Sequence, residues 1–336
     1  MRLLVTGGLG FIGSHTVVEL VEAGHEVVIV DNLCNSKIEV LDNIAKIIGF
    51  KPKFYKIDLV DRGGYETIHK VFEENHFDGV IHFAGLKAVG ESVQKPLEYY
   101  HNNIDGTVNL LQAMREYNVN RLVFSSSACV YGVPETNPIT EDFPSNMVTN
   151  PYGRTKYFIE EILKDCIIAY PDMKVTILRY FNPVGAHKSG LLGEDPNGIP
   201  NNLMPFIQRV AEGKSDTLKI FGNDYPTPDG TCIRDFIHVV DLAKGHVKAI
   251  EKIDEKNLRI LNLGTGKGTS VLELVNAFNK TNGNLVNYEF APRRAGDVPE
   301  NFANPKKAKE EIDWEATLSI EDMCKDSWNF TKHKIK

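Results

Sequence analysis

Short apolar runs alternate with helical patterns through the first 180 residues of the chain. Six runs rich in β-branched and aromatic residues predict strands at residues 3–5, 27–30, 54–57, 80–83, 122–124 and 175–178. Apolar positions at helical spacing predict helices at residues 12–23, 37–48, 64–75, 97–116 and 152–170. Because each helix follows a strand, the pattern predicts an α/β fold with a Rossmann-type, doubly wound parallel sheet.

The local composition of the sequence changes after Asn182, where segments rich in Gly, Pro, Asn and Asp separate shorter predicted elements. Loops carried by a rigid framework are where ligand contacts concentrate. We therefore expect a nucleotide-binding domain at residues 1–182 and a smaller C-terminal α+β substrate domain mainly at residues 183–336. The apolar runs at 236–240 and 259–263 are candidates to rejoin the main sheet.

Composition and charge exclude several classes of protein. The 336 residues are 42% hydrophobic and 25% charged, with a net charge of -7 and interleaved signs, which argues against a nucleic-acid partner. The sequence shows neither the apolar core of a signal peptide nor an apolar stretch that approaches ~18 residues, so we expect no membrane association. The five cysteines are scattered without a Cys-x-x-Cys pair, which predicts reduced thiols, no metal site and a cytoplasmic location.

A glycine-rich turn lies between the first predicted strand and the first predicted helix, and it includes Gly7. The spacing Gly8-x-Gly10-x-x-Gly13 lets the main chain approach a pyrophosphate at the helix N-terminus. Asp31 ends the second strand, where a carboxylate accepts hydrogen bonds from an adenosine ribose and repels a 2′-phosphate. Together they predict NAD rather than NADP. A turn that only packs the helix on the strand, with Asp31 as a cap, is the alternative interpretation.

Two further strand ends point to the same cofactor site. Asp58 and Leu59 follow the third strand, and Phe83, Ala84 and Gly85 follow the fourth. The carboxyl ends of parallel strands form the edge at which open α/β sheets bind ligands. Taken singly, Asp58 is typical of a helix cap and Gly85 of a turn, so the prediction depends on the set.

Candidate catalytic groups follow the fifth strand. This strand runs into Ser125-Ser126-Ser127, and Tyr152 and Lys156 are four residues apart at the start of a predicted helix. That spacing places both side chains on one helix face, where an ammonium is expected to lower the pKa of a phenol from about 10 and let it act as a base. Taken alone, the serines are typical of a turn or cap and Tyr152 of a half-buried packing residue.

The chain resembles the extended short-chain dehydrogenase/reductase family over essentially its full length, and within it the UDP-glucose 4-epimerase family. The stretches that carry the resemblance are residues 31–36, 82–100, 125–132, 179–187, 193–205 and 222–238. It implies Tyr152 as catalytic acid/base, Ser127 as its hydrogen-bonding partner, and Lys156 as the group that holds the NAD ribose and lowers the tyrosine pKa. It also implies NAD contacts from Phe11, Ile12, Asn32, Leu33, Cys34, Asn35, Ser36, Lys87, Asn102 and Phe181.

The UDP-sugar would be held by cations and amides of the second domain, and Asn182, Asn202, Arg234 and Arg294 are placed to supply them. Viewed alone, Arg294 is typical of a solvated surface residue and Asn202 of a helix cap. The resemblance assigns those four to the UDP-sugar and adds Leu203, Lys219, Ile220, Phe221 and the segment 294–297, in which Asp297 would accept from the uridine ribose. It also suggests a homodimer, and the long helical patterns at 97–116 and 152–170 are candidates to pair with their copies as a four-helix interface.

The implied reaction inverts an unactivated carbinol at sugar C4, which requires a bond to break and re-form. Transient oxidation to a ketone by NAD, with Tyr152 handling the hydroxyl proton, would interconvert UDP-glucose and UDP-galactose. Some relatives carry a bulky tyrosine where this chain has Asn301, so we expect UDP-N-acetylated sugars to be admitted as well.

Two other functions use the same cofactor site. A nucleotide-sugar 4,6-dehydratase shares the first oxidation, but dehydratases of this family typically have an Asp-Glu pair where Ala128-Cys129 stands here. A non-catalytic NAD-binding regulator is the second alternative, and it has little need of Ser127, Tyr152 and Lys156 together.

Overall fold

The computed structural model describes residues 1–60, 63–145, 147–198, 200, 202–294 and 297–335. These residues form two compact units, which we describe separately. Unit 1 comprises Met1–Val133, Asp142–Tyr180 and Ala243–Leu261, and unit 2 comprises Pro134–Glu141, Phe181–Leu242 and Asn262–Lys336. In the described part of the chain, no helix is both long and apolar enough to span a membrane.

Unit 1 is built on the predicted parallel sheet. Its strands are β1 (Arg2–Thr6), β2 (Glu26–Asp31), β3 (Lys53–Lys56), β4 (Gly79–His82), β5 (Arg121–Ser127) and β6 (Lys174–Tyr180), and β11 (Leu258–Leu263) is the seventh. The order is β11-β6-β5-β4-β1-β2-β3, and every pair among β1 to β6 is parallel. The predicted fold class is confirmed, because each strand run forms a strand and the order reverses next to β1.

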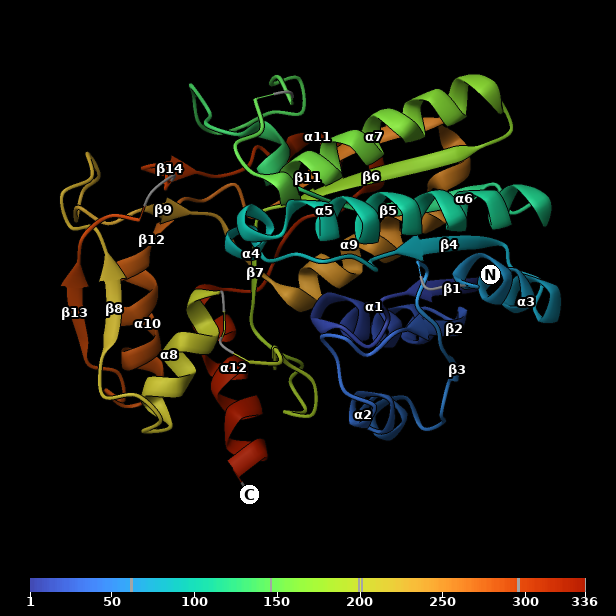
Figure 1. Ribbon diagram of the computed structural model, residues 1–336. Coiled ribbons are helices and arrows are strands. Elements are labelled where there is room, and N and C mark those ends of the chain that lie inside the picture. Colours follow the sequence, from blue (N-terminus) through green and yellow to red (C-terminus); the bar gives the residue numbers. More distant parts are fainter. Residues whose placement is uncertain (61–62, 146, 199, 201, 295–296, 336) are drawn as a thin grey trace. The chain divides into compact units, whose positions relative to one another are not determined.

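Helices of unit 1 alternate with the strands of this sheet along the chain (Figure 1). They are α1 (Phe11–Glu22), α2 (Glu39–Ile48), α3 (Gly64–Glu74), α4 (Val89–Gln94), α5 (Pro96–Tyr100), α6 (Gly106–Glu116) and α7 (Pro151–Ala169). One sheet face, with Leu4, Val80 and Phe124, forms a core with apolar residues of α3, α6 and α7. Strand side chains alternate between faces, so Ser126 points to the same side as Phe124, toward α7.

The helix predicted at residues 97–116 is interrupted. One turn of π-helix, His101–Asp105, lies between α5 and α6. Such turns are frequent at functional sites. The interruption places Asn103 beside the loop that follows β4, as described below.

Unit 2 has a separate core. It contains β7 (Asn182–Val184), α8 (Leu203–Ala211), β8 (Leu218–Phe221), β9 (Ile233–Arg234), β10 (Phe236–His238), β12 (Thr269–Ser270), α10 (Val271–Asn282), β13 (Tyr288–Ala291), β14 (Glu300–Asn301), α11 (Lys306–Ile312) and α12 (Ile320–Ile335). Helices α8, α10 and α12 pack against apolar residues of β8 and β10. Of the two runs considered for the main sheet, residues 259–263 join it in β11, whereas β10 pairs with β7. Helix α9 (Val239–Glu251) follows β10 in the chain and precedes β11, and its residues belong to both units.

Candidate active site

The glycine turn has no room for side chains. A Cβ on Gly13 would lie 2.2 Å from the main-chain oxygen of Gly7, and Gly7 itself has φ +67 with Ala84 packed against it. In the described helix α1, which begins at Phe11, the first turn carries no acidic residue. Main-chain N–H groups at a helix N-terminus attract phosphate, so the turn fits a nucleotide diphosphate.

Asp31 organises the loop that follows β2. Its carboxylate accepts hydrogen bonds from Leu9 N at 3.0 Å, Leu33 N at 2.9 Å and Ser36 Oγ at 2.8 Å. The Asn32 amide donates to Asp58 Oδ2 at 2.8 Å, which connects the ends of β2 and β3. These strand ends and the glycine turn form one edge of the sheet, together with the segment after β4. The predicted NAD residues of unit 1 in these segments are Gly7, Gly10, Phe11, Ile12, Gly13, Asp31 to Ser36, Asp58, Leu59, Phe83, Ala84, Gly85 and Lys87.

Asn103 is a residue that the sequence reasoning missed. It is 2% exposed, and its Oδ1 accepts from Leu86 N at 2.7 Å while its Nδ2 donates to Leu86 O and to Thr155 Oγ1, both at 3.0 Å. The amide therefore links the π-helical turn, the loop after β4 and helix α7. The available signal was an asparagine pair inside a helical pattern, because Asn disfavours helix interiors. Asn102 lies in the same turn, whereas Phe181 is buried in unit 2.

The three predicted catalytic residues lie together in unit 1. Ser127 ends β5, and Tyr152 and Lys156 lie in the first two turns of α7, whose N-cap Asn150 accepts a hydrogen bond from Gly153 N at 2.8 Å. Lys156 is 5% exposed; its Nζ donates to Ser125 O at 2.7 Å and lies 4.8 Å from the ring centroid of Phe124. A phenol, a hydroxyl and an ammonium are thus gathered at one strand end.

The prediction of a lowered tyrosine pKa is wrong for this arrangement. Burial raises the pKa of Tyr152 above its ordinary value, and the hydrogen bond with Ser127 opposes that effect only in part. The Lys156 ammonium instead turns to the main chain of β5, and burial lowers its own pKa to about 8. His82 is buried beside it, and burial together with the charge of Lys156 lowers the pKa of that imidazole to about 3. Lys156 is therefore a desolvated ammonium with a neutral histidine as neighbour.

Unit 2 gathers part of the predicted UDP-sugar residues. Asp297 lies between two arginines: its Oδ2 accepts from Arg294 Nε at 2.9 Å, and its Oδ1 is 3.6 Å from Arg234 Nη2. Asn301 is in register with Arg234 in the β14–β9 pair, and the Arg294 guanidinium lies 5.1 Å from the Phe221 ring centroid. Residues 295–296 of the predicted segment lie outside the described residues.

The other predicted UDP-sugar residues lie elsewhere in unit 2. Asn202 precedes Leu203 and α8, and its amide donates to Glu194 Oε1 at 2.6 Å. Lys219 and Ile220 precede Phe221 in β8, and Asn182 begins β7 with its N–H donating to Asp235 O at 2.9 Å.

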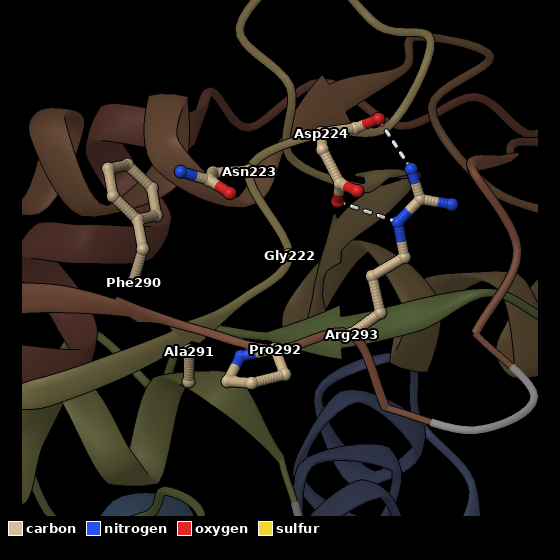
Figure 2. Close-up of a pocket in the computed structure, with 7 residues that line it drawn as sticks. All are labelled: Gly222, Asn223, Asp224, Phe290, Ala291, Pro292 and Arg293. Atoms are coloured by element: carbon tan, nitrogen blue, oxygen red, sulfur yellow. Dashed lines mark hydrogen bonds and ion pairs between the residues drawn. The ribbon is translucent and has the colours of Figure 1, made fainter.

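Unit 2 also contains a pocket whose lining residues are next in sequence to Phe221 and Arg294. Figure 2 shows it between the loop after β8 and the end of β13 with the segment that follows, with Asn223, Asp224, Phe290 and Arg293 among its lining residues. Arg293 Nε donates to Asp224 Oδ1 at 2.7 Å, which links the two segments. None of the lining residues is among the predicted site residues, although Phe221 and Arg294 flank the pocket in the chain.

Comparisons with known proteins agree with this geometry. Residues 3–264 match the NAD dependent epimerase/dehydratase family. The chain is 57% identical to UDP-glucose 4-epimerase of Bacillus subtilis, over 100% of this chain and 98% of that protein. It is similar to the crystal structure of UDP-glucose 4-epimerase from Bifidobacterium longum in complex with NAD+ and UDP, with a TM-score of 0.96, 50% identity and coverage of 100% and 99%. A structure from Stenotrophomonas maltophila, with bound NAD and formylated UDP-arabinopyranose, has a TM-score of 0.96, 47% identity and the same coverage.

The chain belongs to the NAD dependent epimerase/dehydratase family and, within it, to the UDP-glucose 4-epimerases.

Proposed function

We propose that this protein interconverts UDP-glucose and UDP-galactose by transient NAD-dependent oxidation at sugar C4. The observation that carries the proposal is the grouping of Ser127, Tyr152 and Lys156 at the end of β5, in the unit that holds the glycine turn and Asp31. The 57% identity to an epimerase over the full chain supports the same reaction.

The chain's own residues handle the proton and the orientation of the sugar. Tyr152 takes the proton of the 4-hydroxyl and holds it while the sugar is a ketone, and Ser127 hydrogen-bonds the reacting oxygen. When bound, NAD supplies a reversible hydride acceptor and a positive charge that opposes the effect of burial on the Tyr152 pKa. Lys156 would hold the ribose of the bound cofactor. After the ketone has turned its other face, C4 regains the hydride and Tyr152 returns the proton to the oxygen, so proton and hydride both balance over one cycle.

Chromatography of the products from UDP-galactose, with no NAD added to the purified protein, tests the proposal. The expected product is UDP-glucose, formed with cofactor that has remained bound. If UDP-galactose is unchanged both with and without added NAD, the protein is not a 4-epimerase. A dehydrated 4-keto product would assign it to the dehydratases.

We further propose that N-acetylated UDP-sugars are substrates. Asn301 lies in β14, directly in register with Arg234, so its side chain borders the predicted UDP-sugar residues. An asparagine occupies less space there than a tyrosine and leaves room for an acetamido group. Turnover of UDP-GalNAc to UDP-GlcNAc is the expected result, and its absence beside rapid turnover of UDP-galactose would reject this extension.

We also propose a cytoplasmic homodimer. Unit 1 exposes apolar side chains on three neighbouring helices: Val93 of α4 is 62% exposed, Leu97 of α5 is 80% and Phe158 of α7 is 40%. Tyr100 stacks on Phe158 with ring centroids 6.2 Å apart, which makes the patch continuous from α5 to α7. An exposed apolar patch of this kind suits pairing with a second copy. A reducing compartment suits the cysteines, which form no disulfide among the described residues.

A further inference from the structure

We infer that Glu160 is a positioning residue for C4 oxidation: its buried carboxylate ties helix α7, which carries Tyr152 and Lys156, to strand β5, which carries Ser127. The inference rests on the proposed function. It assigns a role in the reaction to a group that touches neither sugar nor cofactor.

The carboxylate is fully enclosed by polar partners. Glu160 is 0% exposed; its Oε1 accepts from Ser126 Oγ at 2.5 Å and from Arg179 Nε at 3.0 Å, and its Oε2 accepts from Arg179 Nη2 at 2.5 Å. Arg179, on β6, is 2% exposed and also donates to Tyr131 Oη at 2.9 Å. A bidentate arginine fixes the orientation of the carboxylate as well as its charge.

Helix α7 contacts strand β5 through side chains at regular spacing in the sequence. Tyr152, Lys156 and Glu160 are four residues apart, so they lie on one face of α7. Ser127 lies next to Tyr152 and acts on its pKa, Lys156 Nζ donates to Ser125 O at 2.7 Å, and Glu160 accepts from Ser126 Oγ. Three adjacent residues of β5 thus contact three successive turns of α7. The Glu160 link holds α7 against β5 and thereby positions the other two side chains.

The charge of Glu160 also acts on Lys156. Burial lowers the pKa of Lys156 to about 8, and the Glu160 carboxylate opposes that effect. His82 on β4 also lies within range of the Lys156 charge, and its imidazole is neutral because burial, together with that charge, lowers its pKa to about 3. Loss of the carboxylate would lower the Lys156 pKa further, so that the ammonium loses its proton at a lower pH.

If the Glu160–Arg179 ion pair had only a structural role, its loss would change different measured quantities. Removing one partner of a buried pair destabilises a protein because a charge remains uncompensated. Such a loss lowers the amount of folded protein, but it leaves kcat per folded molecule and its pH profile unchanged. Ser126→Ala removes the link to β5 while the Glu160–Arg179 pair stays complete, so it separates the two roles.

The experiment measures kcat, KM for UDP-galactose and the pH profile in Ser126→Ala and Glu160→Gln, with cofactor content and folding checked by NAD release and circular dichroism. The matched control is Thr331→Ala, which removes a buried hydroxyl of α12 that donates to Ser327 O at 3.1 Å. We expect kcat to fall by about tenfold in both test variants, because small displacements of catalytic groups are costly, with KM within about twofold. In Glu160→Gln alone, the decline of kcat at high pH should begin at a lower pH.

Each outcome bears on the inference. Wild-type kcat and an unshifted pH profile in the folded variants would overturn it while leaving the proposed function intact. If Glu160→Gln does not fold, Ser126→Ala decides alone, since kcat equal to wild type would overturn the inference. A wild-type protein that forms no UDP-glucose would reject the proposed function and the inference together.

Discussion

The Lys156 ammonium and the main-chain oxygen of Ser125 are joined by a hydrogen bond of 2.7 Å. This bond anchors the helix that carries Tyr152 to the end of the strand that carries Ser127. It also explains why the phenol does not have a lowered pKa: the ammonium is directed at the strand, and burial dominates the surroundings of the tyrosine. The site is therefore rigid in its geometry and depends on bound charges for its proton transfer.

Replacing Tyr152 with phenylalanine should remove the acid/base group and leave the fold intact. We expect kcat for UDP-galactose to fall by about 10²–10⁴-fold, the usual contribution of a positioned proton-transfer group. Tyr170→Phe is the matched control, because Tyr170 caps the far end of the same helix and is 37% exposed. Equal rates in Tyr152→Phe and wild type would favour a non-catalytic NAD-binding protein.

Activity should decline on the alkaline side as Lys156 loses its proton. Burial lowers the pKa of this lysine to about 8, so the ammonium form prevails below that pH and is lost as the pH rises through it. Initial rates between pH 6 and pH 10, taken as kcat/KM, should therefore fall above about pH 8. In Lys156→Met this decline should be absent from the residual activity. A wild-type rate that is constant up to pH 10 would show that the ammonium is not required.

Asp31→Asn should weaken retention of NAD. The carboxylate accepts from two main-chain N–H groups and the Ser36 hydroxyl. In the asparagine, an NH2 group replaces one carboxylate oxygen, so it faces these donors and cannot accept from them. We expect affinity for NAD to fall by about tenfold or more, in line with a lost hydrogen bond to a charged group. The measurement is NAD released per mole of purified protein. Asp42→Asn, at an exposed position of α2, is the control. Equal NAD content in both variants would contradict the role of Asp31.

Leu97→Glu should convert the proposed dimer to monomers. The substitution places a charge on the apolar patch of α5, where Leu97 is 80% exposed. Sedimentation should give about half the wild-type mass, because a buried unpaired charge opposes association. Phe50→Glu, at a 53% exposed position beyond α2, should leave the mass unchanged. A wild-type protein that sediments as a monomer would reject the dimer.

Asn301→Tyr should narrow the substrate range. The larger side chain is expected to lower turnover of UDP-GalNAc by about tenfold, whereas turnover of UDP-galactose changes little, since added bulk in a pocket acts on the larger substrate. Parallel assays with both sugars measure the ratio. Asn304→Tyr, three residues beyond and outside β14, is the control. An unchanged ratio would show that Asn301 does not border the 2-substituent.

The sequence predicted six strands of the unit 1 sheet because short runs rich in apolar and aromatic residues indicate buried strands without knowledge of their partners. It did not predict the π-helical turn at residues 101–105, because the bonds that Asn103 makes are to Leu86 and Thr155, which are distant in sequence. For the same reason the spacing of Tyr152 and Lys156 predicted their shared face but not the direction of Nζ, which Ser125 determines. The sheet of strand β10 was undecided because a short apolar run indicates a buried strand but not its partner, which is β7.

The central claim is that hydride leaves C4 and returns to the same carbon. UDP-galactose labelled with deuterium at C4 tests it directly, with product UDP-glucose analysed by mass spectrometry and proton NMR. The account predicts UDP-glucose that retains the deuterium at C4, because the hydride is held on the cofactor between the two half-reactions. Loss of the label to solvent, or its appearance in a dehydrated product, would contradict the account.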